Sequence, residues 1–240
     1  MKKIRFFRHT AQAVFLVLVF LRLHRQVAPI LAIFLPLAFV CGNFFCGWLC
    51  PLGAIQEFFG RIGVFFVKKK LTLPHRIQHR ARYARYLLAL VLLALVGIGI
   101  MGADDANALS IDAYQSFLAI FDGHPLALAA TAFLAFVLFL SLFTDRPYCN
   151  YLCVNGIEYA LPSFTRIFTI KRHAHSCIAC KACDRRCPMH IEVSGAAEVR
   201  NLQCINCFTC LEACPVNGVL GYGRADETLA KLWKAIGRPR

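Results

Sequence analysis

The sequence predicts an all-α membrane protein, with four transmembrane helices arranged as two repeated hairpins, followed by a small cysteine-rich domain. Three observations lead to this prediction. The 240 residues are 58% hydrophobic and only 17% charged, and the mean hydropathy of +0.57 is too high for a soluble domain of this size. A short motif recurs 103 positions later in the chain. Eight cysteines lie between positions 177 and 214.

Four apolar runs are long enough for the predicted spans, because a bilayer core of about 30 Å needs about 20 apolar residues per helix. Residues 26–56 carry no charge, and residues 86–103 and 125–144 are two further uncharged runs. The first run is expected to span from about residue 4 to residue 23, with arginines reaching the interface at both ends. No small-residue cleavage site precedes Arg22, which argues against a cleaved signal peptide.

The net charge of +14 is distributed along the chain by topology. Basic residues precede the first apolar run and fill the loop 68–85, whereas residues 103–125 contain no Lys or Arg and carry four aspartates. This asymmetry predicts a multi-pass protein with the N-terminus, the central loop and the cysteine-rich domain in the cytoplasm. Membrane lipid is the expected partner of the basic residues, and nucleic acid is not expected.

The recurring motif is a C-x3-C element that follows an apolar run in each copy. Residues 46–53 read CGWLCPLG and residues 149–156 read CNYLCVNG, and an amphipathic stretch follows each copy, at 55–67 and 157–168. Internal repeats of this kind are typical of membrane proteins that build a site between their halves. The membrane part is therefore expected to be two hairpins in parallel repeat.

The C-terminal cysteines form two runs, each with the spacing C-x2-C-x2-C-x3-C-P. This spacing is typical of two-cluster bacterial ferredoxins, in which the fourth cysteine of each run ligates the other cluster. The predicted ligands of one [4Fe-4S] cluster are Cys177, Cys180, Cys183 and Cys214. The predicted ligands of the second are Cys204, Cys207, Cys210 and Cys187. Two alternatives explain the eight cysteines less well. A zinc site needs only four ligands, and the spacing of these runs is not that of a zinc site. A disulfide framework would need an oxidising compartment.

The cysteines of the C-x3-C elements are a candidate third centre. Spaced four apart, Cys46 and Cys50 share one helix face, as do Cys149 and Cys153. Two hairpins in repeat register would bring the four thiols toward one point, where they could hold a metal or a further iron–sulfur centre. A further cluster, a redox-active thiol set and a metal relay all stay open. The competing interpretation is that they are ordinary buried cysteines.

The predicted domain organisation has three parts. Residues 1–170 form the membrane domain, residues 171–225 form a small two-cluster, bacterial-ferredoxin-like domain, and residues 226–240 form a C-terminal tail. The composition changes abruptly to short, cysteine-rich loops after Lys171.

Taken together, the apolar runs, the element CxxxCP at residues 46–51, the second C-x3-C element and the two ferredoxin runs resemble the NapH/NosR-type membrane-bound ferredoxins, the membrane components of [4Fe-4S] quinol dehydrogenases. The resemblance covers nearly the whole chain. Val154 departs from it, because a proline is expected after Cys153. The resemblance implies a multi-pass protein of the bacterial inner membrane with cytoplasmic clusters. It also implies an electron-transfer subunit of a respiratory chain that takes electrons from quinol and passes them to partner redox subunits, either iron–sulfur proteins or cytochromes.

The alternative function is a maturation factor that reduces a metal such as copper with the C-x3-C cysteines during assembly of a terminal enzyme. A membrane anchor for a soluble redox enzyme is a third interpretation. The quinone pocket is expected near the elements of Cys46 and Cys149. Basic residues of the first run, Lys181, Arg185 and Arg186, are expected to attract an acidic electron partner.

Overall fold

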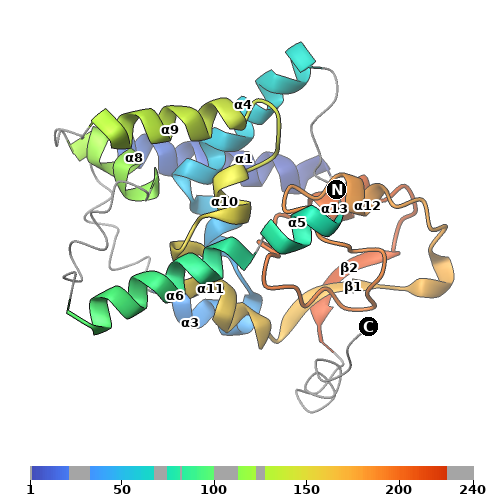
Figure 1. Ribbon diagram of the computed structural model, residues 1–240. Coiled ribbons are helices and arrows are strands. Elements are labelled where there is room, and N and C mark those ends of the chain that lie inside the picture. Colours follow the sequence, from blue (N-terminus) through green and yellow to red (C-terminus); the bar gives the residue numbers. More distant parts are fainter. Residues whose placement is uncertain are drawn as a thin grey trace. The chain divides into compact units, whose positions relative to one another are not determined.

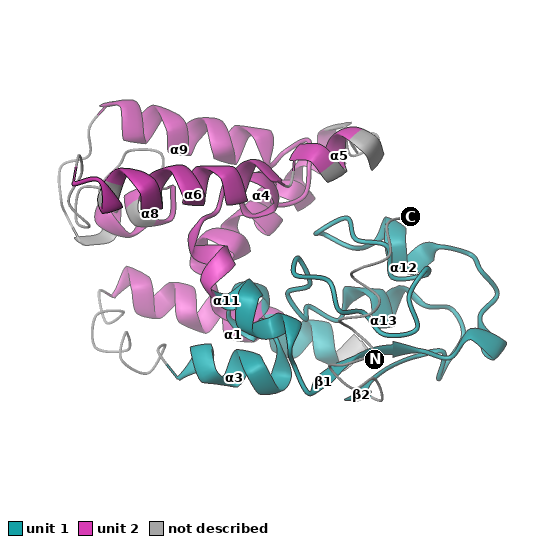
Figure 2. Ribbon diagram, turned by 60° about the horizontal axis from the view of Figure 1, so that its bottom comes forward, with its two compact units in different colours: residues 1–8, 29–47, 159–240 teal, residues 9–28, 48–158 magenta. Residues whose placement is uncertain are grey.

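The computed structural model describes residues 2–21, 33–67, 75–81, 83–99, 113–122 and 128–225. The chain divides into two compact units, which Figure 2 distinguishes by colour. Unit 1 comprises residues 1–8, 29–47 and 159–240, and unit 2 comprises residues 9–28 and 48–158. The predicted domain boundary at residue 170 falls inside unit 1 and stays a prediction. The predicted tail 226–240 lies outside the described residues.

Figure 1 labels the elements of both units. The helices are α1 (Lys2–Phe20), α3 (Phe34–Cys41), α4 (Pro51–Val67), α5 (His75–Ala81), α6 (Tyr83–Gly97), α8 (Ala113–Asp122), α9 (Leu128–Leu140), α10 (Pro147–Tyr151), α11 (Asn155–Phe164), α12 (Ala182–Arg185) and α13 (Thr209–Ala213). A π-helix, η1, spans Phe45–Leu49, and a 3₁₀ helix, η2, spans Ala174–Ser176. The strands are β1 (Phe168–Arg172) and β2 (Leu220–Arg224).

The predicted four-helix transmembrane fold is wrong. Among the residues that the structure describes, no helix combines the length and the apolar character needed to cross a bilayer. Helices α6 and α9 have 15 and 13 residues, which at 1.5 Å per residue gives only about 20 Å. Helix α1 has 19 residues, but Lys2, Lys3, Arg5 and Arg8 occupy its first half. The inner-membrane location stays a prediction.

The uncharged run 26–56 fails as a single span because its described part is broken into separate pieces. Helix α3 ends at Cys41, where Gly42 adopts a φ of 82°, a conformation that residues with a Cβ rarely take. The π-helix η1 and helix α4 then follow as further pieces. Hydropathy alone does not detect such a break, because Gly42 is itself neutral in an apolar run.

Unit 2 is helical, and its helices meet at close contacts. Helix α9 packs against α8 and α4. A Cβ on Gly63 of α4 would lie 1.7 Å from the carbonyl oxygen of Leu142, so the absence of a side chain there permits the approach. The fully buried Arg146 pairs with Glu57 of α4, with 3.0 Å between Nη2 and Oε1.

Unit 1 contains the small sheet and both ferredoxin runs. Strands β1 and β2 pair antiparallel, with Ile170 opposite Tyr222. Residue Val199 donates a backbone hydrogen bond to Ile170, at 2.9 Å, which ties the segment between the two runs to β1. An aromatic cluster covers this core, where the rings of Phe208 and Tyr222 meet edge to face at 5.1 Å.

Candidate functional sites

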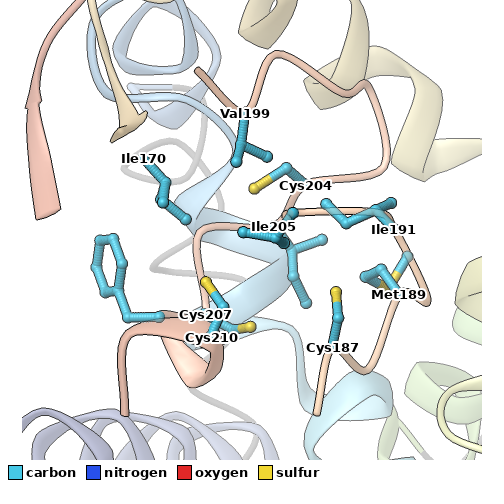
Figure 3. Close-up of a pocket in the computed structure, with 11 residues that line it drawn as sticks. Ile170, Cys187, Met189, Ile191, Val199, Cys204, Ile205, Cys207 and Cys210 are labelled. Atoms are coloured by element: carbon cyan, nitrogen blue, oxygen red, sulfur yellow. The ribbon is translucent and has the colours of Figure 1, made fainter. Parts of the chain in front are cut away.

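The structure brings together four cysteines of unit 1 that come from both runs. Three are from the second run and one closes the first, and together they line a single cavity (Figure 3). We call this set the buried cysteine site: Cys187, Cys204, Cys207 and Cys210. The remaining lining is apolar and includes Ile170, Ile191 and Val199. Cys187, Cys204 and Cys210 are each less than 8% exposed.

A second cavity of unit 1 gathers the other four cysteines in the same crossed manner. We call this set the exposed cysteine site: Cys177, Cys180, Cys183 and Cys214. Cys180 is exposed, and the neighbouring Ile178 is 64% exposed. Both groupings agree with the three-plus-one assignment of the sequence analysis, while ligation itself stays a prediction.

The backbone of both runs repeats one conformation that explains the grouping. Ala179 and Lys181 both have a φ of 54°, and the equivalent residues Asn206 and Phe208 have φ values of 48° and 57°. Left-handed residues that alternate with right-handed ones direct successive backbone N–H groups to one side, a concavity that binds anions and recurs at iron–sulfur sites. An iron–sulfur cluster with four thiolates is such an anion, so the donor set and the backbone both fit it.

Burial raises the pKa of three thiols at the buried cysteine site. Desolvation is the largest cause at Cys187, Cys204 and Cys210, and at Cys210 the neighbouring cysteines raise the pKa further. Bound iron requires thiolates and supplies the positive charge that stabilises them. At the exposed cysteine site, a hydrogen bond from the backbone of Ala179 lowers the pKa of the Cys177 thiol.

The C-x3-C cysteines show a repeated local contact. The backbone N–H of Gly53 donates to Cys50 Sγ at 3.5 Å, and that of Gly156 donates to Cys153 Sγ at 3.3 Å. These pairs are equivalent in the two copies of the motif. Cys149 accepts a hydrogen bond from Gln56 at 3.6 Å. Burial raises the pKa of its thiol, and the Arg146 charge opposes this.

The predicted convergence of these four thiols stays a prediction. Cys46 belongs to unit 1, and Cys50, Cys149 and Cys153 belong to unit 2. Within the described ranges, no three His, Cys, Asp or Glu side chains are grouped as around a single metal ion.

Unit 2 also contains a cavity of about 450 Å³ between α1 and α4. Its polar lining is His9, Gln12, Glu57 and Arg61, and its apolar lining includes Leu16, Phe58 and Phe59. Gln12 contacts the ring of His9 at 2.9 Å and donates to Glu57 at 3.4 Å. Sequence reasoning missed this site, although Glu57 is the only acidic residue before Asp104, a signal that could have found it.

Comparisons with known proteins cover both kinds of cysteine motif. The 4Fe-4S dicluster domain family matches residues 169–215, which hold both cysteine sites. The 4Fe-4S binding domain family matches residues 27–74 and 126–157, which hold the C-x3-C elements. The regulatory protein NosR of Pseudomonas aeruginosa is 29% identical over 168 residues, covering 69% of this chain and 23% of NosR. The ferredoxin-type protein NapH of Escherichia coli K12 is 24% identical over 182 residues, covering 71% of this chain and 58% of NapH.

The chain is a NapH/NosR-type iron–sulfur protein. Another relative is YccM of Escherichia coli K12, which is named for electron transport and is 30% identical over 205 residues, 83% of this chain and 56% of YccM. The chain thus spans little more than half the length of YccM and of NapH. No solved structure matches it. The present chain therefore belongs to an iron–sulfur electron-transfer protein family.

Proposed function

We propose that this NapH/NosR-type protein is a respiratory electron-transfer subunit that holds two [4Fe-4S] clusters, oxidises quinol and reduces a partner redox subunit. One observation carries the proposal: two cavities of unit 1 are each lined by four cysteines, with Cys187 and Cys214 exchanged between the runs. A bound [4Fe-4S] cluster takes up and releases single electrons. The protein contributes the thiolates and, at the buried cysteine site, an apolar lining that excludes water.

The cavity of unit 2 is the proposed quinol site. A volume of about 450 Å³ suits a small organic molecule. The aromatic rings of Phe58 and Phe59 and the side chain of Leu16 suit an apolar ring and tail, whereas His9 and Glu57 suit hydroxyl groups. The expectation of a pocket near the C-x3-C elements supports this choice, because Gln56, next to Glu57, donates to Cys149.

Oxidation of quinol to quinone releases two electrons and two protons. The ring of His9 and the carboxylate of Glu57 are the proton acceptors that line the cavity. The buried Arg146 guanidinium pairs with Glu57 and stabilises its ionised form, which is the form that accepts a hydrogen bond from a quinol hydroxyl.

The exposed cysteine site is the proposed exit to a partner. The charged side chains around it, Lys181, Arg185 and Arg186, are exposed, and Ile178 adds apolar surface. Such a surface suits an acidic redox protein that docks transiently. Replacing Arg185 and Arg186 with glutamate is expected to slow reduction of an acidic acceptor, with a marked dependence of the rate on salt concentration. An unchanged rate at low ionic strength would contradict this partner.

The C-x3-C cysteines are proposed to hold a further iron–sulfur centre. The match of a 4Fe-4S binding domain family to both C-x3-C segments and the repeated glycine-to-sulfur contacts support this role over metal reduction during enzyme assembly. Copper bound in stoichiometric amount and lost after Cys46→Ala and Cys149→Ala would favour the assembly role instead.

The iron and acid-labile sulfide contents of anaerobically purified protein test the proposal. About eight irons per chain correspond to two cubane clusters, and about ten to twelve to an additional centre. A quinol analogue should then reduce the clusters. His9→Ala should slow this reduction, while the control His175→Ala, at an exposed position of η2, should not. Clusters that are intact but inert to quinol would refute the quinol step and leave cluster binding standing.

A further inference from the structure

The two cysteine sites carry different residues at equivalent positions. The second run follows the first at an offset of 27 residues. Thr209 stands where the first run has Ala182, and Leu211 stands where it has Asp184. Since the reduction potential of a cluster depends on charge, hydrogen bonds to sulfur and solvent exposure, these differences bear on the potentials.

A buried guanidinium lies beside the buried cysteine site. Arg166 is 1% exposed, and its Nε donates to Thr169 at 3.1 Å. It also donates to the carbonyl oxygen of Val199, a residue that lines the cavity. Its guanidinium also donates a hydrogen bond to the Cys204 thiol, which places a positive charge beside one sulfur atom of the site.

A second buried arginine reaches the same site through a hydroxyl. Arg8 is 4% exposed and donates from Nη1 to Thr209 Oγ1 at 3.2 Å and to the carbonyl of Cys207 at 3.4 Å. The Thr209 hydroxyl in turn donates to Cys207 Sγ at 3.4 Å. The chain of donors therefore ends on a sulfur ligand, where a donated hydrogen bond stabilises added negative charge. Two acids of neighbouring segments are paired with arginines: Glu212 with Arg5 at 3.7 Å, and Glu198, next to Val199, with Arg200 at 3.3 Å.

The exposed cysteine site differs in having a carboxylate beside one of its sulfur atoms. Cys183 Sγ lies 3.7 Å from Asp184 Oδ1. The backbone N–H groups of Val193 and Ser194 donate to the same oxygen, at 2.7 and 2.8 Å, and hold the carboxylate beside this sulfur. The half-buried Arg172 donates a hydrogen bond to the Cys177 thiol, so one cation also acts on this site, whereas Lys181, Arg185 and Arg186 are exposed. A charge facing water acts about fourfold more weakly than one in a protein environment, and salt screens it further.

We propose that Arg166, together with Arg8 acting through Thr209, gives the cluster of the buried cysteine site a higher reduction potential than the cluster of the exposed site. The first electron taken up by the protein then resides at the buried site. Each cluster gains one electron, and no bond is made or broken. The inference rests on the proposed binding of two clusters and is independent of quinol oxidation. Arg166 and Thr209 thus act on the cluster from beside its sulfur ligands and are not ligands themselves.

A redox titration of the anaerobically purified protein, with dithionite as reductant and EPR as readout, tests the proposal. A Cys177→Ala variant, which keeps only the cluster of the buried site, assigns the two signals. Arg166→Gln should lower the reduction potential of the cluster at the buried site. At a fixed solution potential, the ratio of reduced to oxidised cluster should fall at least tenfold, which corresponds to about 59 mV for one electron. Thr209→Ala should lower the same potential by a smaller amount.

Matched variants at the first run provide the controls. Ala182→Thr and Asp184→Asn should raise the potential of the exposed site only, and Arg172→Gln should leave the buried site unchanged. If the Arg166→Gln variant does not fold, the potential of the buried site in the Thr209→Ala variant tests the proposal, because this replacement removes only a side-chain hydroxyl and methyl group.

The inference is overturned if two clusters are present and titrate at equal potentials, or if neither Arg166→Gln nor Thr209→Ala moves the signal of the buried site. An iron content below two clusters would instead refute the proposed function.

Discussion

Cys187 and Cys214 tie the C-terminal loops of unit 1 together, because each ends one cysteine run and lines the cavity formed by the other. In each run, three residues separate the third cysteine from the fourth, and the fourth lines the cavity of the other run. A cluster bound in this way cross-links positions that are far apart in sequence, and neither run can complete its own site.

Double replacements of cysteine test this exchange. If Cys187 serves the second run, Cys187→Ala combined with Cys204→Ala should lose one cluster, and about four irons should remain. Cys187→Ala combined with Cys177→Ala should lose both clusters, because each site then lacks a ligand. Iron content and EPR intensity give the answer, with each single variant as reference. The reverse outcome would show that each run holds its own fourth ligand.

Gly47 is the second residue where a small change should have a large effect. A Cβ there would lie 2.1 Å from the carbonyl oxygen of Ile205, a backbone atom of the second run, and the carbonyl of Gly47 accepts from Arg8 Nε at 3.1 Å. The Gly47→Ala replacement should therefore displace the second run, with a loss of about 1–3 kcal/mol in the free energy of unfolding. Thermal unfolding and the EPR signal of the buried site measure both effects.

Gly221 of β2 is the matched control, because a Cβ there meets nothing within 4 Å. Gly221→Ala should leave the signal of the buried site and the Tm unchanged. Equal effects of the two replacements would contradict the assigned packing of Gly47.

The helices show what hydropathy could and could not predict. The four apolar runs do contain helices, namely parts of α1, α3, α6 and α9. Their ends depend on local geometry, such as the left-handed Gly42 after α3 and the turns after Leu140. Composition does not encode such breaks. The 31 uncharged residues 26–56 therefore predict one span, although the structure divides them.

The crossing of α4 and α9 in unit 2 offers a test at Gly63. The nearest atoms to an added Cβ all belong to the backbone of Leu142, at 1.7 to 2.7 Å, so no side-chain rotation can make room. Gly63→Ala should destabilise the protein by at least about 1–3 kcal/mol, which lowers Tm by about 2–4 °C per kcal/mol. Gly97→Ala, near the end of α6 and in open space, should be neutral or stabilising by about 0.5–1 kcal/mol. A Tm equal to wild type for Gly63→Ala would refute the close crossing.

In the whole molecule, the sequence was most informative where chemistry imposes a strict spacing. The grouping of eight cysteines follows from their intervals alone, because thiolates must surround a cluster. Arg8 and Arg166 could not be assigned to the buried cysteine site in advance, since the contacts of Arg8 with Cys207 and of Arg166 with Val199 depend on how residues 2–8 and the segment after α11 pack in unit 1. In the sequence, Arg8 belongs to the basic residues before the first apolar run, which indicate topology.

Removal of iron should loosen part of unit 1 and spare unit 2. Helices α12 and α13 have four and five residues, too few to be stable alone, and a two-stranded sheet is marginal. Bound clusters therefore supply much of the stability of residues 168–224. Without iron, the raised pKa of the buried thiols leaves them neutral and without cross-links. Hydrogen exchange after chelation should show lost protection in α13 and β2, with unchanged protection in α4 and α9. Unchanged protection throughout would show that the loops fold before they bind iron.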